Sequence, residues 1–151
     1  MSLQFNVTSR GQLKMDKPAT AKILVIDYDR ATRDDIVQHL RLSDLDLVIK
    51  SAHNPVTGLQ TAGQFLPDLI ILDLLLPGGV GANYVAELKA EPRLRLAKII
   101  MLTAEDSYAN SWQSFDDGVD SFISKPLDLM ELTAQVEVLL ASKARQPHAP
   151  H

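Results

Sequence analysis

Four short runs of apolar residues recur along the chain and predict buried β-strands. They occupy residues 23–26, 69–72, 99–102 and, more weakly, 119–123. A fifth segment, residues 45–49, alternates apolar and polar positions, which is typical of an edge strand with one wetter face. The pattern therefore predicts five strands.

The segments between these runs carry apolar residues at helical spacing. Asp29 and Asn54 precede the first two segments and favour the position before a helix, and Pro55 suits the first helical position. Gly118 suits the position after the fourth. The predicted helices cover residues 30–42, 54–65, 81–90, 108–117 and 128–141.

Strands that alternate with helices predict βαβ units and a parallel sheet covered on both faces. The expected fold class is therefore α/β, as a flavodoxin-like doubly wound (βα)5 three-layer sandwich with strand order 2-1-3-4-5. In such folds ligands bind beyond the carboxyl ends of the strands, between the first and third strands. Chemistry is expected at that edge of the sheet.

The two ends of the chain differ from this pattern. Residues 21–141 form the predicted domain. Residues 1–20 show only a weak alternation around Phe5 and Val7, so we expect a mobile arm there, with a small hairpin as the alternative. Residues 142–151 are small and polar with two prolines, which predicts a tail or linker.

Composition narrows the function. The chain of 151 residues has a net charge of −4, so it offers no broad basic field to nucleic acid. It has no cysteine, which excludes disulfides, thiolate metal sites and cysteine nucleophiles. No apolar run approaches the roughly 20 residues that span a bilayer, and no signal-peptide core is present. We expect a cytoplasmic protein without a membrane partner.

Polar residues end the apolar runs at the predicted ligand-binding edge. Asp27 and Asp73 end the first and third strands, and Thr103 and Lys125 end the fourth and fifth. A single aspartate after a strand is as readily explained as a helix cap as by function. Two aspartates at one crevice favour a functional site. An ammonium and a hydroxyl can hold phosphoryl oxygens, while the carboxylates can bind Mg²⁺ or act as a nucleophile.

At this point the chain resembles the receiver domain of bacterial two-component response regulators, the CheY-like family. The resemblance extends over about residues 21–141. It is carried by residues 23–27 (ILVID), 67–81 (PDLIILDLLLPGGVG), 102–104 (LTA) and 125–126 (KP). It implies a signalling phosphoprotein that receives a phosphoryl group from a histidine kinase or a phosphotransfer protein, and not an enzyme beyond its own phosphorylation and dephosphorylation.

The resemblance also implies residue roles. Asp73 is the phosphoacceptor, Thr103 the switch hydroxyl and Lys125 the phosphate-contacting lysine, in a lysine–proline bond that is typically cis. Phe122 is the aromatic residue whose rotamer follows Thr103. A downstream protein or output domain would bind the face between Tyr108 and Ala141, and a homodimer is left open.

The metal site and the phosphoryl lifetime are implied in the same way. Mg²⁺ would be held by Asp27, Asp73 and the backbone carbonyl of Leu75. The side chains of Leu75 and Glu105 stand at positions that tune how long the phosphoryl group persists. An apolar Leu75 would hinder the attacking water.

One departure from the family pattern affects this metal site. The family usually has two consecutive acids after the first strand, and here the second is Tyr28. A protonated phenol, with an unperturbed pKa of about 10, is a poor Mg²⁺ ligand. Asp29 could supply the missing oxygen, directly or through water, or could serve only as the first helix's cap.

Three functions follow from these features. The first is a phosphorylatable receiver centred on Asp73. The alternative is a pseudo-receiver, weakened at the metal site by Tyr28, that acts as a phosphorylation-independent interaction module. The third is an enzyme on the same fold, which is disfavoured because no second catalytic acid stands two residues after Asp73.

Overall fold

A parallel β-sheet forms the centre of the computed structural model, which describes residues 4–7, 13–16, 20–73, 81–104 and 118–145. Its strands are β3 (Ala21–Ile26), β4 (Leu47–Ala52), β5 (Leu69–Asp73), β6 (Lys98–Ala104) and β7 (Ser121–Lys125). They lie in the order β4-β3-β5-β6-β7, and neighbours run parallel. The predicted order 2-1-3-4-5 and the predicted fold class are confirmed.

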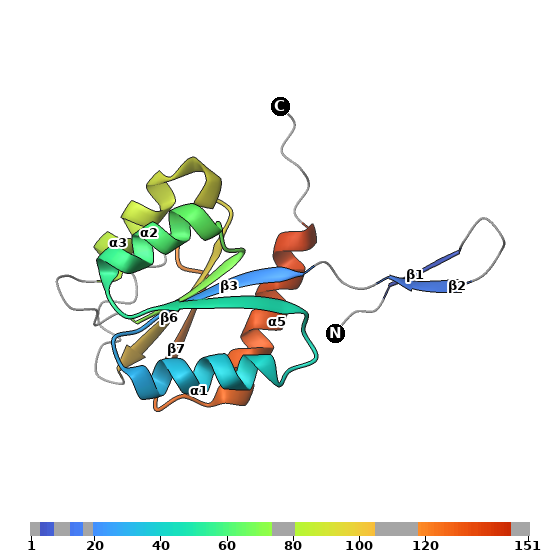
Figure 1. Cartoon of the computed structure of the whole chain (residues 1–151), viewed down its shortest axis with the longest axis horizontal. Coiled ribbons are helices and arrows are strands. Elements are labelled where there is room, and N and C mark those ends of the chain that lie inside the picture. The colour runs from blue at the N-terminus through green and yellow to red at the C-terminus, as the bar shows by residue number, and fades with distance from the viewer. Residues whose placement is uncertain (1–3, 8–12, 17–19, 74–80, 105–117, 146–151) are drawn as a thin grey trace.

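Helices cover both faces of this sheet, as Figure 1 shows. The helix predicted over residues 108–117 lies outside the described residues. None of the described helices is long and apolar enough to cross a bilayer. The helical elements are α1 (Arg30–Arg41), α2 (Pro55–Phe65), α3 (Gly81–Ala90), the short 3-10 helix η1 (Pro92–Leu94) and α5 (Leu129–Arg145). In Figure 1, α2 and α3 lie on one side of the sheet, and α1 and α5 lie on the other.

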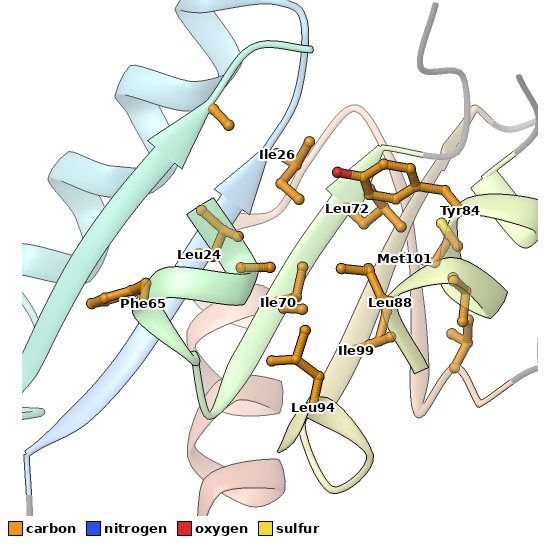
Figure 2. Packing of buried hydrophobic residues seen from close by; sticks show 14 residues of the cluster. Leu24, Ile26, Phe65, Ile70, Leu72, Tyr84, Leu88, Leu94, Ile99 and Met101 are labelled. Atoms are coloured by element: carbon orange, nitrogen blue, oxygen red, sulfur yellow. The ribbon is translucent and has the colours of Figure 1, made fainter. Parts of the chain in front are cut away.

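The core consists of two apolar layers, because successive residues of a strand point to opposite faces. Leu24 and Leu72 belong to the layer beneath α2 and α3, which Figure 2 shows from close by. Val25 and Ile71 belong to the layer beneath α1 and α5. All five residues of β5 are buried, so this strand lies at the centre of the sandwich. Because the strand is buried along its whole length, Asp73 at its end has a fixed position.

The edge strand β4 begins two residues later than predicted and ends three residues later. Its pairing with β3 starts at Ala21 opposite Leu47 and continues to Ile26 opposite Ala52. The carbonyl of Asp46 already accepts the hydrogen bond from the N–H of Ala21, so the ladder fixes the boundary. Alternation along the sequence does not reveal where pairing begins.

Helix α5 continues to Arg145, four residues beyond its predicted end. The added turn is anchored to the sheet, because Lys143 Nζ lies 3.0 Å from Asp68 Oδ1. The other oxygen of Asp68 accepts a hydrogen bond from the N–H of Lys22 at 2.8 Å. The next proline after Pro126 is residue 147, so no proline in residues 142–145 interrupts the helix.

A separate two-stranded antiparallel sheet lies near the N-terminus (Figure 1). It consists of β1 (Gln4–Val7) and β2 (Leu13–Asp16). The sequence favoured a mobile arm for residues 1–20, with a small hairpin as the alternative, and within this range the structure describes only these two paired strands.

Two glycines of α2 test how tightly this helix packs. A methyl group at Gly58 would overlap Tyr84 Oη and come within 3.0 Å of Ile26 Cδ1, whereas one at Gly63 would meet no described atom within 4 Å. We expect Gly58→Ala to lower the free energy of unfolding by about 1–3 kcal/mol through overpacking. Gly63→Ala should raise it by up to about 1 kcal/mol through helix propensity. Denaturant unfolding measures both, and shifts of equal sign would contradict this packing.

Candidate functional site

Two buried carboxylates end neighbouring strands at the carboxyl edge of the sheet. Asp73 is the last residue of β5, and Asp27 directly follows β3. The two strands pair in register up to Ile26 and Leu72, which places the aspartates side by side. Asp27 is 0% exposed and Asp73 is 2% exposed. Burial of two acids at one edge requires a counter-charge.

Lys125 supplies that counter-charge. Its Nζ lies 3.1 Å from Asp27 Oδ2 and 3.1 Å from Asp73 Oδ2, so one ammonium bridges both carboxylates. Lys125 ends β7, two strands away from β5, and its peptide bond to Pro126 is cis. The structure therefore brings together three of the residues that the sequence singled out.

Asp27 is held by two further donors that the sequence analysis missed. The N–H of Asp29 donates to Asp27 Oδ1 at 2.9 Å. Arg33 Nη1 donates to the backbone carbonyl of Asp27 at 2.7 Å. The position of Arg33 in the first turn of α1 was the only available signal, and it does not specify where a long side chain reaches. Both contacts fix the loop that carries Asp27.

The pKa values in this cluster follow from burial and from the neighbouring charges. Burial raises the pKa of Asp27, and the charge of Asp73 raises it further; the Asp29 N–H and Lys125 offset only part of this. Burial alone would lower the pKa of Lys125, but Asp73 and Asp27 outweigh it, so the pKa of Lys125 is raised. Ionisation of Asp27 is therefore energetically unfavourable in the folded chain, whereas Lys125 stays protonated at neutral pH.

This shift predicts that Asp27→Asn stabilises the fold at neutral pH. Because the pKa of folded Asp27 is raised, its contribution to stability is present below its ordinary pKa and is lost as the pH rises through the folded value. We expect the variant to gain about 0.5–2 kcal/mol at pH 7 and to match the wild type in acid. Urea unfolding across this pH range measures the difference. A variant less stable than the wild type at pH 7 would show that the Lys125 contact outweighs desolvation.

A buried hydroxyl lies at the same edge. Thr103 is 0% exposed, and among the described residues its Oγ1 has no hydrogen-bond partner. Thr103 of β6 pairs with Ser124 of β7, and Met101 pairs with Phe122. Phe122 therefore lies on the same face of the sheet as Thr103, on the neighbouring strand and two residues further from the carboxyl edge. Phe122 is partly buried against the layer beneath α2 and α3. A buried hydroxyl without a partner is costly, which favours a site for a ligand oxygen.

The phenol of Tyr28 and the carboxylate of Asp29, which follow Asp27, do not complete a cluster of three carboxylates. Tyr28 is 54% exposed. Asp29 is also exposed, and its Oδ2 accepts a hydrogen bond from Thr32 Oγ1 at 2.6 Å. This hydrogen bond lowers the pKa of Asp29. Asp29 occupies the cap position of α1 without bonding a backbone N–H through its side chain. Within the described ranges, no three acidic or histidine side chains gather closely enough to hold a metal.

The donor set still fits a hydrated Mg²⁺. This ion usually takes one or two carboxylates and completes its octahedron with water and phosphate oxygens. Each carboxylate oxygen has two lone pairs, so the hydrogen bonds from Lys125 and from the Asp29 N–H leave acceptor positions on Asp27, and Asp73 ends the neighbouring strand. These two residues would hold the ion.

Other predicted positions lie outside the described residues. They are Leu75 with its carbonyl, Glu105, and residues 108–117 of the predicted partner face. The described part of that face consists of β7 and the exposed side of α5, where Met130 and Val138 are 76% and 61% exposed.

The sequence matches known proteins over most of its length. The family model of the response regulator receiver domain matches residues 23–137. RpaA of Synechocystis sp., a DNA-binding dual master transcriptional regulator, is 35% identical over 128 residues, which are 85% of this chain and 52% of RpaA. The response regulator PleD of Caulobacter vibrioides is 32% identical over 129 residues, which are 82% of this chain and 27% of PleD. The chain thus spans about half of the length of RpaA and about a quarter of the length of PleD.

Solved structures share the fold. A CheY-like response regulator receiver domain protein from Methanospirillum hungatei superposes with a TM-score of 0.73 at 25% identity, over 85% of this chain and 100% of that one. The chemotaxis response regulator CheY4 of Vibrio cholerae gives a TM-score of 0.73 at 22% identity, over 80% of this chain and 99% of that one.

Proposed function

The chain belongs to the response regulator receiver domain family, and from this premise we propose that Asp73 accepts a phosphoryl group from a histidine kinase or a phosphotransfer protein. The observation that carries the proposal is the ammonium of Lys125, 3.1 Å from the carboxylates of both Asp27 and Asp73. It places a positive charge beside the proposed nucleophile in a buried site. There it would be worth more than in water.

The transfer needs few protein groups. A carboxylate oxygen of Asp73 attacks phosphorus, the bond from phosphorus to the donor's imidazole nitrogen breaks, and that nitrogen keeps the electron pair. Lys125 and the hydroxyl of Thr103 would hold the phosphoryl oxygens. Thr103 suits this role because its Oγ1 has no partner within the described residues. Mg²⁺, held by Asp27 and Asp73, would supply further positive charge when bound.

The output would be a change of the surface that β7 and α5 form. A phosphoryl group that accepts a hydrogen bond from Thr103 would draw the end of β6 inward. Phe122 lies on the same face of the sheet as Thr103, opposite Met101, and would respond to this movement. A downstream protein or output domain that binds one arrangement better would then be switched.

Phosphoryl uptake tests this function. The full chain is incubated with Mg²⁺ and acetyl phosphate, and intact mass is measured for the wild type and for Asp73→Asn. We expect one added phosphoryl group on the wild type and none on the variant. Absence of uptake by the wild type at millimolar Mg²⁺, with a fluoroberyllate titration that leaves the amide signals of Thr103 and Phe122 unmoved, would overturn the proposal.

The second candidate, a phosphorylation-independent interaction module, rests on Tyr28. This residue brings no charge to the site, and Lys125 already neutralises one of the two carboxylates. In that case a partner would bind the wild type and Asp73→Asn equally, with and without phosphodonor. A phosphorylatable receiver instead predicts partner binding that differs between these states.

A further inference from the structure

The two strands β1 and β2 form a sheet that is incomplete by itself. Within the described residues they pair only with each other. An isolated two-stranded sheet is at best marginally stable in water, whereas three or more strands with one apolar face reach independent stability. Independent stability would therefore require at least one further strand, or a helix packed against this pair.

Register gives this sheet two unlike faces. Phe5 lies opposite Met15 and Val7 lies opposite Leu13, and these four positions share one face. The other face has Gln4 opposite Asp16 and Asn6 opposite Lys14. The sheet is thus amphipathic, and among the described residues neither of its outer edges pairs with another strand.

We propose that the missing strands come from a second copy of this chain, and that β2 of each copy pairs antiparallel with β2 of the other about a two-fold axis at Met15. The result is a four-stranded sheet in the order β1-β2-β2-β1. It doubles the apolar face to eight positions. The interface is isologous, so it closes after two copies.

Charge selects this edge and this register. With Met15 opposite itself, Lys14 of each copy lies opposite Asp16 of the second copy, and unlike charges at opposite positions of an antiparallel pair are stabilising. The two neighbouring registers that keep the faces aligned place Lys14 opposite itself or Asp16 opposite itself, and each brings like charges together. Strand β1 has no charged residue, so its edge offers no such complementarity. The pairing involves none of the residues around Asp73, so it is independent of phosphorylation.

A cysteine on the axis tests the pairing directly, because the chain contains no other cysteine. Opposite residues of an antiparallel pair have Cα atoms about 4.5–5.5 Å apart, within the range that a disulfide bridges. We expect full-length Met15→Cys to form a covalent dimer on mild oxidation. Asn6→Cys is the matched control: the two β1 strands would be three strand spacings, about 14 Å, apart. Equal crosslinking of both variants, or none of Met15→Cys, would overturn the proposal.

Charge exchange gives a second test on the same full-length chain. Lys14→Asp places two like-charged pairs across the axis and should weaken the dimer about tenfold or more. The double variant Lys14→Asp, Asp16→Lys restores the opposite charges and should restore the dimer. Sedimentation velocity measures both. A wild type that is monomeric at all concentrations, or a dimer insensitive to Lys14→Asp, would rule out this interface.

Discussion

Lys125→Met is expected to lower the free energy of unfolding by about 3 kcal/mol at neutral pH, because it leaves two buried carboxylates without a counter-charge. Lys125 Nζ lies 3.1 Å from an oxygen of Asp27 and 3.1 Å from an oxygen of Asp73. The side chains of these aspartates are 0% and 3% exposed, so water screens their repulsion poorly. The Lys125 side chain itself is 27% exposed, which keeps the expected loss below that of a fully buried pair.

The pH dependence of this loss in stability follows from the raised pKa of Asp27. Without Lys125 that pKa rises further, so the penalty is absent when Asp27 is protonated and grows as the pH rises through the folded value. Urea unfolding at acidic and neutral pH measures the effect. The double variant Asp27→Asn, Lys125→Met should recover most of the lost stability, and Mg²⁺ should recover part of it in the single variant. If Lys125→Met lost the same free energy of unfolding at both pH values, the cause would be lost packing and not charge.

The sheet order was predictable because it depends on a local property, the length and polarity of apolar runs. Burial on both faces gives β3, β5 and β6 continuous apolar sequences, and the alternation of strands with helices then specifies parallel pairing. Boundaries were less predictable. The start of β4 depends on its pairing with β3, and the last turn of α5 is held by Lys143 and Asp68, which are 75 residues apart.

The candidate site was predictable to the extent that strand ends define it. Asp27, Asp73 and Lys125 meet because parallel strands bring their carboxyl ends to one edge. The contacts of Arg33 and of the Asp29 N–H depend on loop and side-chain conformations that no spacing rule contains. The sequence left Asp29 open as either a metal ligand or a cap, and the structure engages its carboxylate with Thr32.

The charge balance of the site connects the stability predictions with the proposed function. Two carboxylates and one ammonium leave one net negative charge, and the folded chain tolerates this at the cost of a raised pKa at Asp27. A receiver with a third carboxylate would carry two negative charges and would need the metal more. At this site, stability without metal and affinity for metal therefore oppose each other.

Tyr28→Asp tests this opposition and is expected to tighten Mg²⁺ binding about tenfold, by adding a charged oxygen next to Asp27. Tyr28 is 54% exposed, so the ring can be replaced without opening a core cavity. Without Mg²⁺ the added carboxylate should lower the melting temperature, and saturating Mg²⁺ should reverse the loss. Tyr28→Phe is the control, since it removes only the hydroxyl and should leave the affinity unchanged. Calorimetric titration and thermal unfolding measure the two effects, and equal Mg²⁺ affinity in Tyr28→Asp and the wild type would mean that other oxygens already fill the position.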